Sequence, residues 1–143
     1  MVEFLGFESG PRSNFTTTPN VMYDYFLGVL SGNEFKALSY IVRHTWGYHK
    51  NEDAISLNQF LNGIVRKEDG SRIDGGVGMS KPTIINALDS LENKWGAILK
   101  TKRKDYRGGN MTNKYRLKYI EDIENGSNGE TEEKTGNQKS TGC

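Results

Sequence analysis

Few residues of this chain have the types and spacing that enzyme or metal chemistry needs. The 143 residues contain two histidines, His44 and His49, and one cysteine, Cys143. A zinc site needs three or four such ligands at set spacings and a disulfide needs a second cysteine, so neither is predicted. The paired acids at 52–53 and 68–69 fall in turn-like segments, where neighbouring carboxylates rarely converge on one substrate. No cofactor or metal site is indicated, and the chain is not expected to be an enzyme.

A glycine-rich segment, residues 75–81 (GGVGMSK), invites comparison with a phosphate-binding loop. Such a loop places Lys directly after the last Gly, and Ser or Thr directly after the Lys. Here two residues separate the last glycine from Lys81, and Pro82 removes an amide N–H from the cradle. Residues 75–79 are therefore interpreted as a flexible hinge.

Charge does indicate a partner, because it is distributed unevenly along the chain. The net charge of +1 combines −3 over residues 1–93, +8 over residues 94–118 and −4 over residues 119–143. The middle segment holds nine Lys or Arg residues against a single acid, Asp105. A concentrated block of cations of this kind is typical of a surface that binds nucleic acid.

Capping signals and apolar periodicity predict helices over 20–30, from Ser31 to about 47, from Ser56, and over 80–93. Ser31 and Ser56 each open a capping box, S-x-x-E or S-x-x-Q. His44, at the end of the second helix, is expected to interact with the helix dipole. The expected inward faces are Val21, Tyr25 or Phe26, and Val29; Phe35, Leu38, Ile41, Val42 and Thr45; Phe60 and Leu61; and Ile84, Ala87, Leu88 and Leu91.

Strand signals predict two hairpins and one short strand. Residues 64–65 and 72–73 flank an Asp-Gly turn, and residues 98–104 and 114–119 flank a Gly-Gly turn. Strict alternation predicts a second hairpin with one buried and one cationic face. Residues 54–55 are expected to form the short strand. The buried face would carry Tyr115, Leu117 and Tyr119, and the cationic face Lys114, Arg116 and Lys118.

This order of elements is that of a winged helix-turn-helix domain, so the predicted fold class is mainly α with a small β-hairpin. Helix 80–93 then corresponds to the recognition helix, whose first turns enter the major groove, and the second hairpin to the wing. Asn86 is suited to pair with adenine, and Ile85 to contact a thymine methyl. The predicted DNA-binding residues are Ser80, Lys81, Thr83, Ile85, Asn86, Lys100, Lys102, Arg103, Lys104, Arg107, Lys114 and Arg116. For Lys114 and Arg116 alone, a solvated strand face is an equally good explanation.

Five short motifs add a family resemblance: TPN at 18–20, GNEFK at 32–36, RHTWGY at 43–48, DAISL at 53–57 and GMSKPTI at 78–84. With them, most of residues 15–95 resembles the N-terminal DNA-binding domain of the phage replication protein O family. The resemblance implies binding at a replication origin and recruitment of host helicase-loading machinery. The chain departs from the family in the connection at 63–79, which is longer than the turn of a simple helix-turn-helix. This connection is expected to reposition the recognition helix or to add contacts through Arg66, Lys67 and Arg72.

The predicted organisation is a flexible arm at 1–14, a winged helix domain at 15–120 and a disordered acidic and polar tail at 121–143. No signal peptide or apolar span is apparent, so the expected location is the cytoplasm of a bacterial host cell, without a membrane partner. The predicted function is sequence-specific binding of double-stranded DNA at a phage or mobile-element replication origin, with a homodimer on repeated sites. The alternatives are a phage or plasmid transcriptional repressor, and a protein-interaction module that kept the fold without DNA binding.

Overall fold

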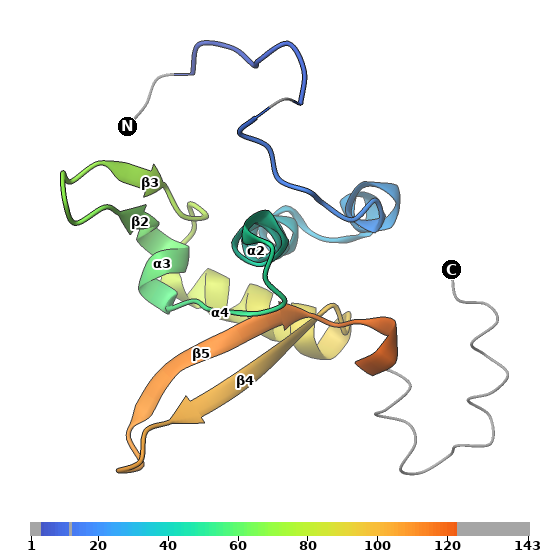
Figure 1. Ribbon diagram of the computed structural model, residues 1–143. Coiled ribbons are helices and arrows are strands. Elements are labelled where there is room, and N and C mark those ends of the chain that lie inside the picture. Colours follow the sequence, from blue (N-terminus) through green and yellow to red (C-terminus); the bar gives the residue numbers. More distant parts are fainter. Residues whose placement is uncertain (1–3, 12, 123–143) are drawn as a thin grey trace, which may run out of the picture.

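The computed structural model describes residues 4–11 and 13–122 and shows a mixed fold of helices and small antiparallel sheets (Figure 1). The first half contains η1 (Met22–Phe26), α1 (Leu27–Val29), α2 (Gly32–His44), η2 (Trp46–Tyr48), β1 (Asp53–Ala54) and α3 (Leu57–Asn62). The second half contains β2 (Ile64–Val65), β3 (Arg72–Asp74), α4 (Lys81–Asp89), η3 (Ser90–Lys94), β4 (Ile98–Lys104) and β5 (Asn110–Leu117). Within the described residues, no helix has the length and apolar character needed to cross a bilayer. The predicted tail, apart from residues 121–122, lies outside the described residues.

Helix α2 begins at the capping box that the sequence predicts. The Ser31 hydroxyl accepts a hydrogen bond from the Glu34 backbone N–H at 3.1 Å, and the Glu34 carboxylate accepts one from the Ser31 N–H at 2.8 Å. These bonds satisfy N–H groups that a helix start otherwise leaves unpaired. The same carboxylate accepts a hydrogen bond from the Ser90 hydroxyl in η3, which holds the pKa of Glu34 below its usual range. One acid therefore both starts α2 and connects it to the end of the α4–η3 helix.

The core lies where α2 packs against α4 and against β5. The inward faces predicted for α2 and for helix 80–93 are confirmed, with Phe35 only partly buried. The second capping box, at Ser56 and Gln59, opens α3 and directs Phe60 into the same core. The fully buried large side chains are Leu38, Ile41, Thr45, Ile55, Phe60, Ile84, Leu91 and Ile98.

The larger sheet has three antiparallel strands in the order β1-β5-β4. Ile98 pairs with Leu117 and Tyr115 lies on the same face, so the predicted buried face is confirmed at Tyr115 and in part at Leu117, which packs against the core half-buried. Tyr119 lies beyond β5 and is half-buried, as are Lys114, Arg116 and Lys118. The strand boundaries differ from the prediction. β5 begins at Asn110, four residues early, and ends before Tyr119, because its first residues extend a ladder with β4 that continues to the turn.

The inward face predicted for the first helix is wrong at Val21 and Val29, and of the alternatives Tyr25 and Phe26 the structure selects Phe26. Val21, Tyr25 and Val29 are exposed, whereas Met22 and Leu30 are buried and Phe26 packs against the core. Both sets of residues are apolar and both recur every four residues, so periodicity alone cannot choose between them. Packing makes the choice, because η1 and α1 contact the core along only one stripe.

The connection between α3 and α4 is a packed segment rather than the predicted hinge. It contains the predicted small hairpin, in which Ile64 of β2 pairs with Asp74 of β3. After β3, the Val77 side chain is buried and its N–H donates to the Phe60 carbonyl at 2.8 Å. His44 ends α2 as expected, but it is buried, and its Nε2 lies 3.1 Å from the Asp74 carboxylate. The expected dipole interaction is therefore replaced by a hydrogen bond to the connection.

Within this connection, the backbones at the two ends of the β2–β3 hairpin approach each other closely at Gly63 and Asp74. Gly63 has φ +80°, and a Cβ built on it would lie 2.0 Å from the Asp74 carbonyl oxygen. Gly70, at the hairpin turn, has the similar φ of +74° but open space around it. Both glycines have a positive φ, and Gly63 adds two costs for a larger residue: the steric clash and a ψ of −161°, which is disfavoured for alanine.

Gly70→Ala is expected to lower the free energy of unfolding by about 1–2 kcal/mol, the cost of a left-handed backbone for alanine. Gly63→Ala is expected to lose about 1–3 kcal/mol more, because its ψ is disfavoured for alanine and the added methyl group forces β2 and β3 apart. Urea denaturation of both variants measures the difference. Equal losses would show that β2 and β3 are not in close contact at this position.

Candidate nucleic-acid interface

Helix α4 starts at the predicted cap. The Ser80 hydroxyl accepts a hydrogen bond from the Thr83 N–H at 3.4 Å and lies 2.8 Å from the Thr83 hydroxyl, with Pro82 in the first turn. Ser80 and Thr83 therefore hold each other, and Thr83 is half-buried. Lys81 is exposed at the first position of the helix. The beginning of α4 is thus ordered by side chains that the sequence assigned to DNA contact.

Ile85 and Asn86 both lie on the solvent side of α4. Ile85 is 45% exposed, which is high for an apolar side chain in the middle of a helix whose other face is buried. Asn86 is exposed and lines a shallow hollow of about 380 Å³ between α4 and the start of α2. Within the described part of the chain, its side-chain amide takes part in no hydrogen bond. Both groups are free to meet a partner without rearrangement of α4.

The β4–β5 hairpin ends in a tight turn built on one acid. The Asp105 carboxylate accepts hydrogen bonds from the N–H groups of Arg107 at 2.9 Å and Gly109 at 2.8 Å. Gly108 has φ +86°, a conformation that glycine adopts without strain. The sole acid of the cationic segment therefore serves as a cap for the turn.

Four of the predicted cations surround this turn, and we call them the tip cations: Lys102, Arg103, Lys104 and Arg107. Among the described residues, none of them has a carboxylate within 4.0 Å. The guanidinium of Arg103 donates across the hairpin to the Thr112 carbonyl at 2.8 Å, which fixes its position without neutralising it. With Asp105 turned toward the backbone, this end of the hairpin presents a concentrated positive charge.

The other three predicted cations of the hairpin, Lys100, Lys114 and Arg116, form ion pairs within the chain, and we call them the base cations. Lys100 lies 3.9 Å from Glu92, and Lys114 lies 3.3 Å from Glu52. Arg116 makes two hydrogen bonds, of 2.6 and 2.7 Å, to the Asp122 carboxylate. The structure thus divides the predicted cationic surface into a paired base and an unpaired tip.

Figure 1 shows how the β4–β5 hairpin lies relative to α3 and α4. In Figure 1 the β4–β5 hairpin projects past α3, and its turn lies on the side where α4 begins. A groove of about 400 Å³ runs between the hairpin and the residues that lead into α3, bordered by Lys102, Arg103 and Lys104. The cationic groove thus lies between the hairpin and the residues that lead into α3, and its lining includes no residue of α4.

Tyr106 is a residue of the hairpin turn that the sequence reasoning missed. It is 89% exposed at the turn, the Arg107 guanidinium lies 5.2 Å from its ring centroid, and the Arg107 Nε donates to its hydroxyl at 3.0 Å. The signal was present in the sequence, because an aromatic residue among cations in a glycine turn (RKDYRGG) is not needed for packing. An exposed ring beside a guanidinium is suited to stack on a base or to pack on a sugar.

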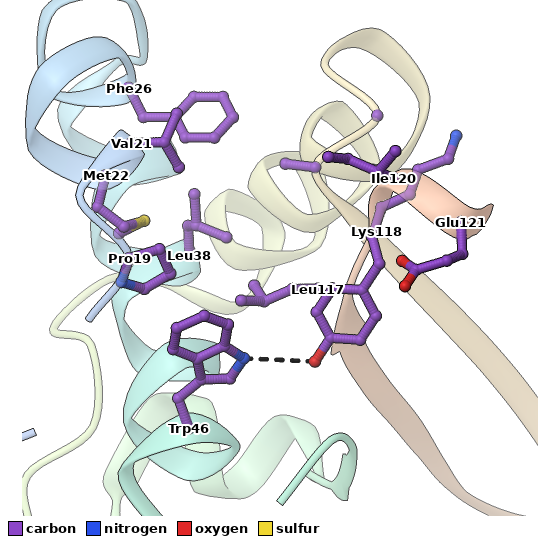
Figure 2. A pocket seen from close by; sticks show the side chains of 13 residues that line it. Pro19, Val21, Met22, Phe26, Leu38, Trp46, Leu117, Lys118, Ile120 and Glu121 are labelled. Carbon is purple, nitrogen blue, oxygen red and sulfur yellow. Dashed lines mark hydrogen bonds between the residues drawn. The ribbon is translucent and has the colours of Figure 1, made fainter. Parts of the chain in front are cut away.

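A second cleft, of about 560 Å³, lies at the opposite end of the hairpin and has a different character (Figure 2). Most of the residues that line it are apolar, and they come from residues 19–26, from Leu38 and Trp46, from residues 96–97 and from residues 117–121. At its floor the Trp46 indole N–H donates to the Tyr119 hydroxyl at 3.3 Å. Trp46 and Trp95 pack against the core. Two of the lining residues, Lys118 and Glu121, carry opposite charges, so the cleft has no cationic surface.

Comparisons of the chain with protein-family models, with curated proteins and with solved structures found no match. The resemblance to the phage replication protein O family therefore stays a prediction from the sequence motifs. Functional inference rests on the geometry of α4 and of the hairpin.

The Arg116–Asp122 pair generates a pH prediction. Arg116 holds the pKa of Asp122 at about 2, below the ordinary value of 3.8, so the pair is intact above pH 4 and is lost as the pH falls through 2. Arg116→Gln is expected to return the pKa of Asp122 most of the way toward 3.8, because only the Tyr119 N–H still donates to the carboxylate. Carboxyl carbon NMR titration measures this shift. An unchanged pKa would mean that Arg116 is as free as the tip cations.

Proposed function

We propose that this chain is a winged helix protein that binds double-stranded DNA in a sequence-specific manner. The order α2, β1, α3, α4, β4, β5 and the sheet order β1-β5-β4 support this assignment. In such a domain α4 is the recognition helix and the β4–β5 hairpin is the wing. The small hairpin β2–β3 is an addition between α3 and α4.

The observation that carries the proposal is the set of tip cations. Among the described residues, four positive charges without an ion pair gather at one turn, although acids in η3, before β1 and after β5 pair with the base cations. Placing like charges together lowers stability, and a bound polyanion would neutralise these charges and offset that cost. Phosphates of a duplex do so with release of counterions, which makes binding favourable and dependent on salt.

Specificity is assigned to the exposed face of α4. The Asn86 amide is unpartnered and has the donor and acceptor that adenine needs in the major groove, and exposed Ile85 provides an apolar contact for a thymine methyl. Lys81 and the Ser80–Thr83 pair lie at the helix start, where contacts to phosphates fix the register of a recognition helix.

The biological role that we propose is recognition of a phage or mobile-element replication origin. The sequence motifs at 18–20, 32–36, 43–48, 53–57 and 78–84 support it, because they resemble the replication protein O family. Recruitment of helicase-loading machinery and pairing of two copies on repeated sites belong to the same proposal. Transcriptional repression would use the same surface, and the genomic position of the bound sites distinguishes the two roles.

A protein-interaction module is the second candidate, and one observation favours it. The outer face of η1 and α1 exposes Tyr23, Tyr25 and Leu27, each at least 50% accessible. Exposed apolar side chains gathered on one element are typical of protein contact surfaces. A module of this type that had lost DNA binding would show no salt-dependent affinity for any duplex.

Replacing Lys102, Arg103 and Lys104 together with Ala is expected to weaken binding to every duplex. Each lost phosphate contact reduces the slope of log K against log [salt] by about 0.9, so the slope should become less steep by roughly 2 to 3. Fluorescence anisotropy over a salt series measures it. The matched control is Lys100→Ala with Lys114→Ala, which removes base cations from the same hairpin and should leave the slope within about 1 of wild type. A slope that is unchanged in the triple variant would remove the wing from the DNA-binding surface.

Asn86→Ala is expected to lose discrimination among sequences while non-specific binding survives. Sites are first selected by the wild-type protein from a random duplex pool. The variant should bind the selected duplex about 10-fold or more weakly and a scrambled duplex with unchanged affinity. Equal loss on both duplexes would make Asn86 a phosphate-positioning residue instead. Selected sites that occur as repeats within or near the gene itself would support origin recognition, and sites that overlap promoters would support the repressor.

A further inference from the structure

A small polar cluster joins the β2–β3 addition to α2. The Tyr40 hydroxyl donates to Asp74 Oδ1 at 2.9 Å, and the His44 Nε2 lies 3.1 Å from Asp74 Oδ2. Asp74 Oδ1 also accepts the backbone N–H of Gly76 at 3.0 Å. Tyr40 and His44 are buried, with 7% and 3% of their surfaces exposed. We call these four groups the Asp74 cluster.

The protonation states of the cluster suit these bonds. Burial raises the pKa of Tyr40 well above its ordinary value, so its hydroxyl keeps its proton and donates it. Burial also lowers the pKa of His44, so the imidazole is neutral at pH 7 and its Nε2–H tautomer is the one that donates to the carboxylate. Asp74 therefore accepts hydrogen bonds from three groups in a partly buried place, where leaving them unmade is costly.

The cluster lies on the only covalent path into α4 from α3. Two restraints follow Asp74 in sequence: the Gly76 N–H bond, and then the buried Val77, whose N–H donates to the Phe60 carbonyl at 2.8 Å. Only two residues then remain before the Ser80 cap. The start of α4 is thereby tied to α2 through the cluster and to α3 through Val77.

We propose that Asp74 is a positioning residue for DNA recognition, which fixes the beginning of α4 by bonding the inserted hairpin to α2. The inference rests on the proposed function and extends it to a residue that does not reach the DNA. A recognition helix discriminates bases only if its side chains are held within about 0.5 Å of the productive geometry. Phosphate contacts by flexible cations tolerate larger shifts, because they carry no sequence information. Loss of the cluster should therefore reduce discrimination more than overall affinity.

The chain offers a conservative variant and a matched control. Asp74→Asn keeps one oxygen for Tyr40 and Gly76, and its amide N–H₂ donates to His44 in the other tautomer. Asp74→Ala removes all three bonds. Asp69→Ala removes the same charge from the same hairpin at its exposed turn, where the carboxylate accepts the Ser71 N–H at 3.0 Å. Comparison of the three variants separates the effect of losing the hydrogen bonds from the effect of losing a negative charge.

Affinities of the full chain are measured on the selected and the scrambled duplex, at a temperature where circular dichroism shows each variant fully folded. Asp74→Ala is expected to lose about 10-fold on the selected duplex and less than about 2-fold on the scrambled one. Asp74→Asn and Asp69→Ala are expected to discriminate as wild type does. Wild-type discrimination in Asp74→Ala, or equal loss on both duplexes, overturns the proposal. If Asp74→Ala does not fold, Tyr40→Phe removes a single bond, and a smaller loss in the same direction supports the proposal, whereas unchanged discrimination overturns it.

Amide hydrogen exchange without DNA separates this proposal from the proposed function. Asp74→Ala should speed exchange at Val77 and at Ile84, whose N–H makes the first helical bond of α4 to Ser80. Unchanged protection there overturns the positioning role even if DNA binding is confirmed. Wild-type protein that binds no duplex overturns the proposed function, and the exchange result then still shows whether Asp74 fixes the start of α4.

Discussion

The contact between the apolar stripes of α2 and α4 determines where the other elements lie. Ile41 of α2 and Ile84 of α4 are fully buried, and burial of each such side chain contributes about 1.5–3 kcal/mol. The outer face of α4 points away from this contact, and the β4–β5 hairpin starts directly after η3 and packs on the same core through Ile98 and Tyr115. The exposed helix face and the hairpin turn therefore have fixed positions relative to each other, set by the core.

Whether a cation of the hairpin is paired with an acid depends on how far it lies from that core. Near the sheet, Glu92, Glu52 and Asp122 each take one cation, so the base is close to neutral. At the turn the single acid, Asp105, accepts hydrogen bonds from backbone N–H groups and offsets only part of the charge of the four tip cations, so the field there is strongly positive. The overall charge of +1 conceals this separation, since exposed charges further apart than about 8 to 10 Å hardly interact at physiological salt. The location of the charges, more than their sum, describes what the surface attracts.

Local patterns in the sequence predicted local structure well, but they could not predict contacts between residues that are distant in the sequence. The caps at Ser31, Ser56 and Ser80, the inward faces of α2 and α4 and the alternation in β5 follow from neighbours within four residues, whose physics is the same in any fold. Which acids neutralise the base cations does not follow, because the Lys114–Glu52 pair spans 62 residues. The His44–Asp74 bond joins residues that are 30 positions apart. It holds the start of the segment that the sequence predicted as a hinge against α2. The face of the first helix was underdetermined, since two stripes were equally apolar.

The close approach at Gly63 also bears on how the chain is connected. Gly76 touches the same backbone, since a Cβ built on it would lie 2.9 Å from the Gly63 nitrogen. Entry and exit of the inserted hairpin thus meet at one point, although 12 residues separate them in the sequence. To α3 and α4 the insertion is equivalent to a short loop, with its extra length carried outside the path between them. Residues can therefore be added or removed at the turn between β2 and β3 without moving the flanking helices, provided that Asp74 at the end of β3 keeps its bonds to α2.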